Sequence, residues 1–131
     1  MALELINPDD LPTPASYTQV VAATGIRLVF VAGQVADDAR GHLVGAGDLA
    51  TQAGLAFANL GRCLAAAAAR PEQVARITIY VVGFRSEHLP VISAARIAVF
   101  GDHKPADTLL GVQTLAEPGY LIEVEAIAVV D

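Results

Sequence analysis

The chain has 131 residues and a formal net charge of −6, so we expect one domain over residues 1–131 that is long enough to bury a core. Its 8 Lys and Arg residues are scattered singly along the sequence. Because phosphate groups are bound mainly by Lys and Arg, no nucleic-acid or anionic-membrane partner is expected. The single cysteine, Cys63, excludes an internal disulfide, and the first residues carry no secretory signal; both features predict a cytoplasmic protein.

The apolar content is high, since 54% of the residues are hydrophobic. A transmembrane helix does not account for it, because the longest apolar stretch, residues 54–69, contains Asn59 and Arg62 and ends at Arg70 and Pro71. We therefore expect part of each chain's surface to be buried against other copies of the chain.

Strand signals follow an extended, irregular segment, residues 7–16, which holds three prolines. The expected strands are the runs 17–23, 27–35, 74–82, 108–112 and 120–130. Gly25 supplies a tight turn between the first two strands. The apolar run of the second strand indicates a strand that is covered on both faces.

Two helices are expected between these strands. Asp48 is the predicted N-cap of the first helix, whose apolar residues recur at helical spacing until Pro71 ends it. Ser86 caps the second helix, with Pro90 in its first turn and Gly101 after its end. The order ββαβαββ predicts an α+β sandwich in which one sheet carries two helices on one face. The other face then needs a cover, which a copy of the chain can supply.

Metal, nucleotide and thiol sites lack their usual sequence patterns. The three histidines have no metal-ligand spacing, so no metal is expected. Gly45 and Gly47 do not form a phosphate-binding loop, and Cys63 lies on the apolar face of the first helix, where it is expected to pack. We expect no cofactor.

Two carboxylates, Glu123 and Glu125, interrupt the otherwise apolar last strand. Strand side chains alternate between faces, so both share a face with Ile127. Burial of an unpaired charge is costly, so this pair marks either a subunit seam or a site. Gly33, at the end of a buried strand, either lets a ligand or another backbone approach closely or only bends the strand end.

Six segments carry a resemblance that covers nearly the whole chain: INPDDLPTPASYTQVV, VFVAGQV, GDLATQAGLAFANLGRCLAAA, ITIYVV, PADTLLGV and YLIEVEAIAVV. Together and in this order they resemble the RidA (YjgF) family of small enamine/imine deaminases. The resemblance implies a chorismate-mutase-like fold and a homotrimer in which three sheets form a central barrel. It also implies clefts between subunits that bind small imino or keto acids.

The family's site positions fall on particular residues of this chain. The first Glu of the last strand positions the hydrolytic water in that family, and this role falls on Glu123. The positions that line the cleft fall on Tyr17, early in the first strand, on Gly33 and, in the strand expected over residues 108–112, on Leu109.

The chain departs from the family where the substrate carboxylate is bound. The family has an arginine directly after the Pro-Ala that precedes the strand expected over residues 108–112, whereas this chain has Asp107 there. Ser93 stands where the second helix often has asparagine. Asp107 is expected to repel a ligand carboxylate and, if it shares a cleft with Glu123, to raise the pKa of one of the two carboxyl groups. Alternatively, Asp107 caps a strand end in water. Arg96 either replaces the missing arginine or is a solvated helix residue.

These features predict a cofactor-free homotrimer that binds a small metabolite between subunits. It would hydrolyse an imine or enamine C=N bond through Glu123, without standard 2-imino-acid deaminase activity. The alternative is a non-enzymatic trimer that binds a ligand or a partner on the same scaffold. A ribonuclease activity, for which some family members are named, is disfavoured by the acidic charge.

Overall fold

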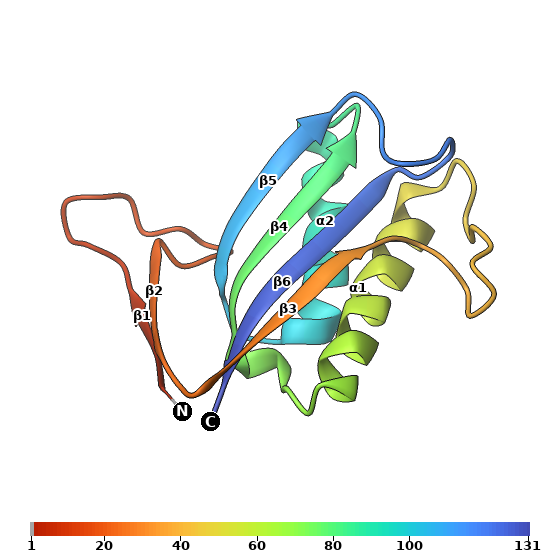
Figure 1. Ribbon diagram of the computed structural model, residues 1–131. Coiled ribbons are helices and arrows are strands. Elements are labelled where there is room, and N and C mark those ends of the chain that lie inside the picture. Colours follow the sequence, from red (N-terminus) through yellow and green to blue (C-terminus); the bar gives the residue numbers. More distant parts are fainter. Residues whose placement is uncertain (1) are drawn as a thin grey trace.

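The protein has an α+β fold in which two helices pack against one face of a β-sheet (Figure 1). The computed structural model describes residues 2–131. The strands are β1 (Ala2–Ile6), β2 (Val20–Thr24), β3 (Arg27–Gln34), β4 (Val74–Val82), β5 (Ala106–Val112) and β6 (Ile122–Val130), and the helices are α1 (Leu49–Ala66) and α2 (Leu89–Phe100). The fold class predicted from the sequence is confirmed.

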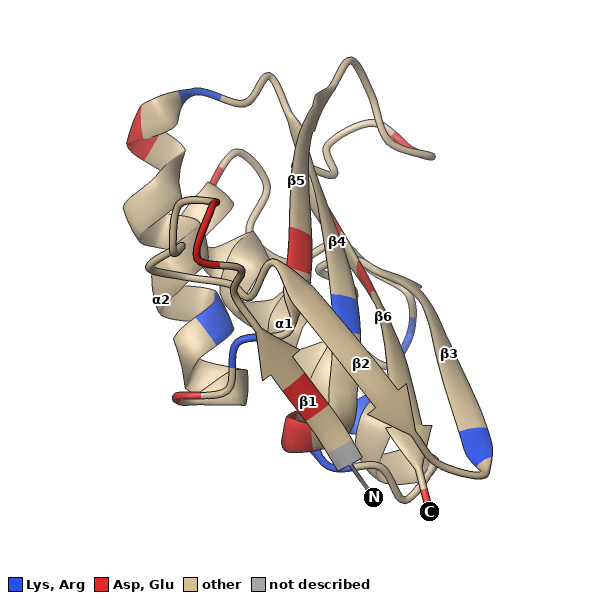
Figure 2. Ribbon diagram, turned by 90° about the vertical axis from the view of Figure 1, so that its left-hand side faces the viewer, with Lys and Arg blue, Asp and Glu red and all other residues tan. Residues whose placement is uncertain are grey.

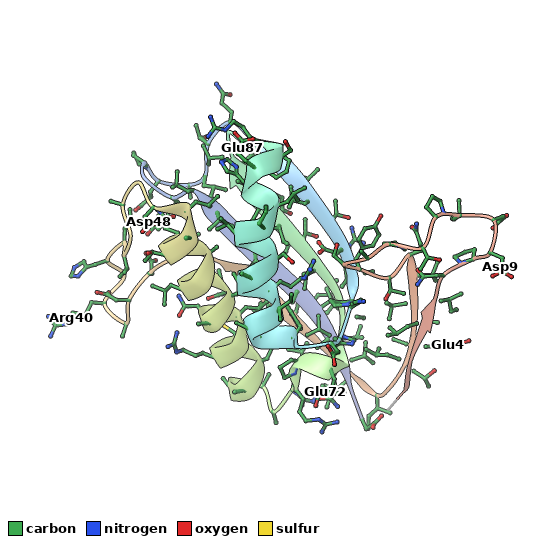
Figure 3. The ribbon with its side chains drawn as sticks, turned by 180° about the vertical axis from the view of Figure 1, so that it is seen from behind. Glu4, Asp9, Arg40, Asp48, Glu72 and Glu87 are labelled. Carbon is green, nitrogen blue, oxygen red and sulfur yellow. The ribbon has the colours of Figure 1, made fainter. Side chains whose placement is uncertain are left out.

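The main sheet has four strands in the order β3-β6-β4-β5. β6 pairs antiparallel with both β3 and β4, whereas β4 and β5 are parallel because α2 crosses between them. This order places β3 and β5 at opposite edges of the sheet. Both helices lie on the same face, side by side (Figures 1 and 3).

The N-terminal hairpin corrects the expectation of one sheet. The strand predicted over residues 17–23 is the shorter β2, and it pairs with β1, which was not predicted, in a separate two-stranded ribbon beside the sheet (Figure 1). Residues before β2 are held at the β5 side, because the Thr18 amide donates to the Pro105 carbonyl at 3.3 Å. The chain then turns at Gly25, where an added Cβ would lie 2.6 Å from a methyl group of Val129.

The helix ends agree with the sequence signals at Asp48 and Gly101 but differ at two other positions. The Asp48 carboxylate accepts from the Thr51 amide at 3.2 Å and caps α1 as predicted. α1 ends before Pro71, because Ala68 adopts a left-handed backbone with φ of 56°. Ser86 begins a 3-10 turn, Ser86–His88, and the residue that precedes α2 is His88.

The core lies between the helices and the sheet. Its centre includes an edge-to-face contact between Phe57 of α1 and Phe100 of α2, with ring centroids 6.5 Å apart. Figure 3 shows side chains filling this layer, with the labelled charged residues at the periphery of the molecule: Glu4, Asp9, Arg40, Asp48, Glu72 and Glu87. Within residues 2–131, no helix is long and apolar enough to cross a membrane.

The sheet face opposite the helices is open in a single chain, so the expected cover on both faces of β3 would need a second copy of the chain. Val29 and Val31 are buried against the helices, whereas Leu28 is 59% and Phe30 70% exposed. Phe30 pairs in register with Ile127 of β6, which lies on the same face as Glu123 and Glu125. An exposed apolar patch therefore lies on the same sheet face as these carboxylates.

Candidate functional site

Four of the six predicted site residues line one pocket, on the side of the sheet where α2 faces β5. The cavity has a volume of about 380 Å³ and includes Tyr17, Ser93, Asp107 and Leu109 in its wall. The rest of the wall is formed by Ser16, Ile79, Leu89, Pro90, Ile92 and Arg96. A mainly apolar cavity with a few polar groups, at the small end of the usual size range, suits a small organic ligand.

Tyr17 reaches this pocket from the segment before β2, and not from within a strand as predicted. The neighbouring Thr18 fixes the segment, because its amide donates to the Pro105 carbonyl and its hydroxyl donates to the Lys104 carbonyl. Tyr17 is therefore held next to the start of β5, where Asp107 lies.

Asp107 and Arg96 form an ion pair inside the pocket. Arg96 Nη1 lies 3.3 Å from Asp107 Oδ2, and Arg96 Nη2 donates to Ser93 Oγ at 3.3 Å. The Arg96 and Asp107 side chains are only 10% and 9% exposed. Two expectations were thus wrong: Asp107 does not cap a strand end in water, and Arg96 is not a solvated helix residue.

The Arg96 position follows from helical spacing. Ile92 and Phe100, four residues before and after it, are both buried, so Arg96 lies on the face of α2 that points inward. Ser93 precedes it by three residues on the neighbouring part of that face. This spacing is the signal in the sequence for an inward-facing Arg96, whose position the sequence-based prediction had left open. The apolar wall residues Ile79, Leu89 and Ile92 were not predicted.

Burial raises the pKa of Asp107, while the charges of Arg96 and Arg76 partly oppose that shift. Asp107 Oδ2 is satisfied by Arg96, but Oδ1 is buried and has no hydrogen-bond partner among residues 2–131. A buried carboxylate oxygen without a donor is costly, which makes this atom a candidate contact for a ligand.

Glu123 and Gly33 meet on the open face of the sheet. An added Cβ at Gly33 would lie 2.0 Å from Glu123 Oε2, so the absence of a side chain there leaves room for the Glu123 carboxylate. The group that approaches Gly33 is thus a side chain of the same chain. Glu125 has a different environment: it accepts a hydrogen bond from the Tyr80 hydroxyl at 2.7 Å, which raises the pKa of Tyr80.

Asp107 and Glu123 project from opposite faces of the sheet. Asp107 pairs in register with the buried Ile77 of β4, whereas Glu123 pairs with Tyr80, an odd number of residues further along the same strand. Within one chain the two carboxylates therefore do not share a cleft, so a shared cleft would need a second copy of the chain. In the single chain, burial is the main cause of the raised pKa of Asp107. Only a second copy can bring a Glu123 to this pocket.

The fold is that of a known class of small α+β proteins. The chain belongs to the family described as Endoribonuclease L-PSP, whose model matches residues 8–130. Its membership of the RidA (YjgF) family, expected from the sequence, is confirmed by this match and by solved relatives.

One similar structure is a protein of unknown function, YyfB, of the conserved Rid family from Yersinia pestis. It is 38% identical, the match covers 99% of this chain and 100% of that one, and the TM-score is 0.92. A YjgF/YER057c/UK114 family member from Mycobacterium tuberculosis is 28% identical over 87% of this chain and 86% of that one, with a TM-score of 0.65. RidA from an Antarctic Psychrobacter, at 22% identity, coverage of 97% and 99% and a TM-score of 0.69, shares the fold. The comparison with curated proteins gave no match.

Proposed function

We propose that the protein is a cofactor-free, homotrimeric protein of the cytoplasm that binds a small metabolite and hydrolyses its imine or enamine C=N bond. The observation that carries the proposal is the pocket that gathers Tyr17, Ser93, Asp107 and Leu109 beside a buried ion pair. Family membership supports a small-molecule-binding or deaminase-like role in general. The lone cysteine is in keeping with a reducing compartment.

Assembly as a homotrimer is supported by the exposed apolar patch at Leu28 and Phe30. The two edge strands, β3 and β5, lie at opposite sides of the sheet. A closed ring of three copies repeats one heterologous contact, and in this proposal that contact joins the β3 side of one copy to the β5 side of the next. Such a contact would bring Glu123 and Gly33 of one copy towards the Asp107 pocket of its neighbour.

In this proposal, Glu123 acts as the general base. It accepts a proton from a water molecule as the water oxygen attacks the carbon of a protonated C=N bond, and the carbinolamine then breaks down to a carbonyl compound and an ammonium ion. One water is consumed and no electrons are transferred, so neither a metal nor a redox cofactor is required.

Standard 2-imino acids are not the proposed substrates. The guanidinium of Arg96 faces the pocket, but Asp107 and Ser93 already accept its hydrogen bonds. A substrate carboxylate would have to compete with Asp107 for Arg96, whereas a free arginine would bind it in a bidentate pair.

The test is ammonia release from freshly generated imines, measured for the wild type and for Glu123→Gln. The Gln variant keeps the shape of the side chain but cannot accept the proton, so turnover is expected to fall about 10²- to 10⁴-fold, the usual range for a general base. Glu125→Gln is the matched control, because Glu125 is on the same strand face but is held by Tyr80. Equal turnover in the wild type and Glu123→Gln would refute the role of Glu123.

A non-enzymatic, ligand-binding trimer is the second candidate. It is favoured by the separation of Glu123 from the pocket within one chain, because catalysis would then depend entirely on assembly. Ligand binding without ammonia release from any imine would support this candidate. A ribonuclease activity is not proposed, since Lys and Arg are scattered over separate elements without forming a basic stripe (Figure 2).

A further inference from the structure

The buried carboxylate of Asp107 is incompletely satisfied. Its Oδ2 atom is 3.3 Å from Arg96 Nη1, while Oδ1 is buried without a hydrogen-bond partner in the described part of the chain. The Asp107 side chain is 9% exposed and forms part of the pocket wall. A donor supplied from the pocket would satisfy the oxygen that the protein leaves without one.

The rest of the pocket is shaped for an apolar body. Ile79, Leu89, Ile92 and Leu109 line the cavity, whose volume is about 380 Å³. The polar side chains are few and lie close together, because Ser93 and Asp107 both contact Arg96. The geometry suits a ligand with one polar head and a short aliphatic chain.

The charges around Asp107 decide which polar head fits. Arg96 from α2 and Arg76 from β4 are the cations that act on Asp107, and they only partly offset the burial that raises its pKa. A ligand carboxylate would have to take Arg96 from Asp107 and leave a buried carboxylate uncompensated, which is costly. A ligand ammonium adds a donor without displacing any existing contact.

We propose that this pocket binds a small molecule that carries an ammonium or protonated imine N–H next to a short aliphatic group, with Asp107 Oδ1 as the acceptor. The inference rests on the proposed function to the extent that both use the same pocket. It adds the chemical class of the ligand: a cationic nitrogen donor at the position where the RidA family has an arginine for a carboxylate. Aliphatic amines and aliphatic amino acids share this chemistry.

The experiment compares ligands that share an isobutyl group and differ in their polar head. Calorimetry on the wild type would use 3-methylbutylamine, leucine and 4-methyl-2-oxopentanoate. The amine is expected to bind at least about tenfold more tightly than the keto acid, as one charge-assisted hydrogen bond predicts. Leucine distinguishes an amine site from an amino-acid site: binding as tight as the amine's would identify an amino acid, and weaker binding a simple amine.

Asp107→Asn is the informative variant, because it keeps the side-chain shape and removes the charge. It is expected to weaken amine binding about tenfold and to improve keto-acid binding, since Arg96 is released from its carboxylate partner. Asp102→Asn, an exposed residue before β5 that does not line the pocket, makes the same change in net charge and serves as the control. A melting temperature for each variant verifies folding, and the wild-type comparison remains decisive if Asp107→Asn does not fold.

The outcomes separate this inference from the proposed hydrolysis. Keto-acid binding as tight as amine binding in the wild type, unchanged amine affinity in Asp107→Asn, or no binding of any of the three ligands would overturn the inference. Retained amine binding without ammonia release would refute the hydrolysis alone. Turnover that depends on Glu123 together with a preference for keto acids would refute only the cationic ligand.

Discussion

A single added methyl group at Gly33 should separate the structural and functional roles of Glu123. In Gly33→Ala, the new Cβ would lie 2.0 Å from Glu123 Oε2, whereas ordinary contacts begin near 3.4 Å. The carboxylate must therefore move by about 1.4 Å. Because the obstructing atoms belong to the end of a flexible side chain, and the backbone of Gly33 lies outside the left-handed region, the fold should tolerate the change.

The expected result is a large loss of activity with a small change in stability. Misplacing a reacting group by about 1 Å can cost about 10²-fold in rate. Ala also restricts the unfolded chain, which favours folding by about 0.4–1 kcal/mol and offsets part of the strain. We expect ammonia release to fall about 10²-fold while the free energy of unfolding changes by less than about 1 kcal/mol.

A double-mutant cycle in the Glu123→Gln background makes the reasoning testable. If Gly33→Ala acts only by displacing the carboxylate, it should cause no further loss of turnover when that carboxylate is already absent. Gly54→Ala is the control, because a Cβ there has no neighbour within 4 Å among the described residues. Full turnover in Gly33→Ala, or an equal loss in both backgrounds, would show that Gly33 does not act by leaving room for the Glu123 carboxylate.

Three further predictions concern assembly, the hydrogen bonds of the buried Gln52, and pH. Phe30→Asp places a charge in the exposed apolar patch, so light scattering should give the mass of one 13.6 kDa chain for the variant and of three for the wild type; a monomeric wild type would contradict the trimer. Gln52→Leu should reduce the free energy of unfolding by about 1–3 kcal/mol in denaturant titrations, because it removes the side-chain partners of the Gly45 and Gly119 carbonyls and the Leu121 amide; unchanged stability would show that water replaces these bonds. The pKa of Asp107 in the folded state is raised above 3.8, so the wild type should lose stability relative to Asp107→Asn as the pH rises from 3.8 through the folded-state pKa. A difference in melting temperature between the two proteins that stays constant from about pH 4 to 7 would contradict the raised pKa.

The elements that local signals specify were predictable from the sequence. The β4 run, the Asp48 cap and the alternation of Glu123 and Glu125 with buried residues agree with the structure, because they depend on side-chain periodicity and capping chemistry. The departure of β2 from the sheet was not predictable in this way. It depends on the contact of Thr18 with Pro105, far along the chain, and a tight turn at Gly25 is compatible with either path.

The pocket shows the same division between local and long-range information. Tyr17, Ser93, Asp107 and Leu109 were identified through the family resemblance, and the structure places them together. The Arg96–Asp107 pair was not predicted, because a strand and a helix must be placed in three dimensions before the distance between their side chains is known. Charge alone predicted repulsion of carboxylates by Asp107, but the neighbouring Arg96 opposes that repulsion. The argument for a cationic ligand therefore depends on the unsatisfied Oδ1 atom.

In the proposed mechanism, the strand order of the sheet makes catalysis depend on assembly. Glu123 lies on β6, next to the β3 edge and on the open face, whereas Asp107 lies on the β5 edge and on the helix face. A chain that binds its ligand at Asp107 therefore cannot reach it with its own Glu123.

If the trimer is the active form, Phe30→Asp should abolish ammonia release while leaving amine binding to the Asp107 pocket nearly intact, because Phe30 is outside that pocket. Mixing Glu123→Gln with Asp107→Asn chains should, by contrast, restore part of the activity, since a mixed trimer can contain one site in which both residues are wild type. Absence of any recovery in mixed trimers that retain their mass would argue against a site shared between subunits.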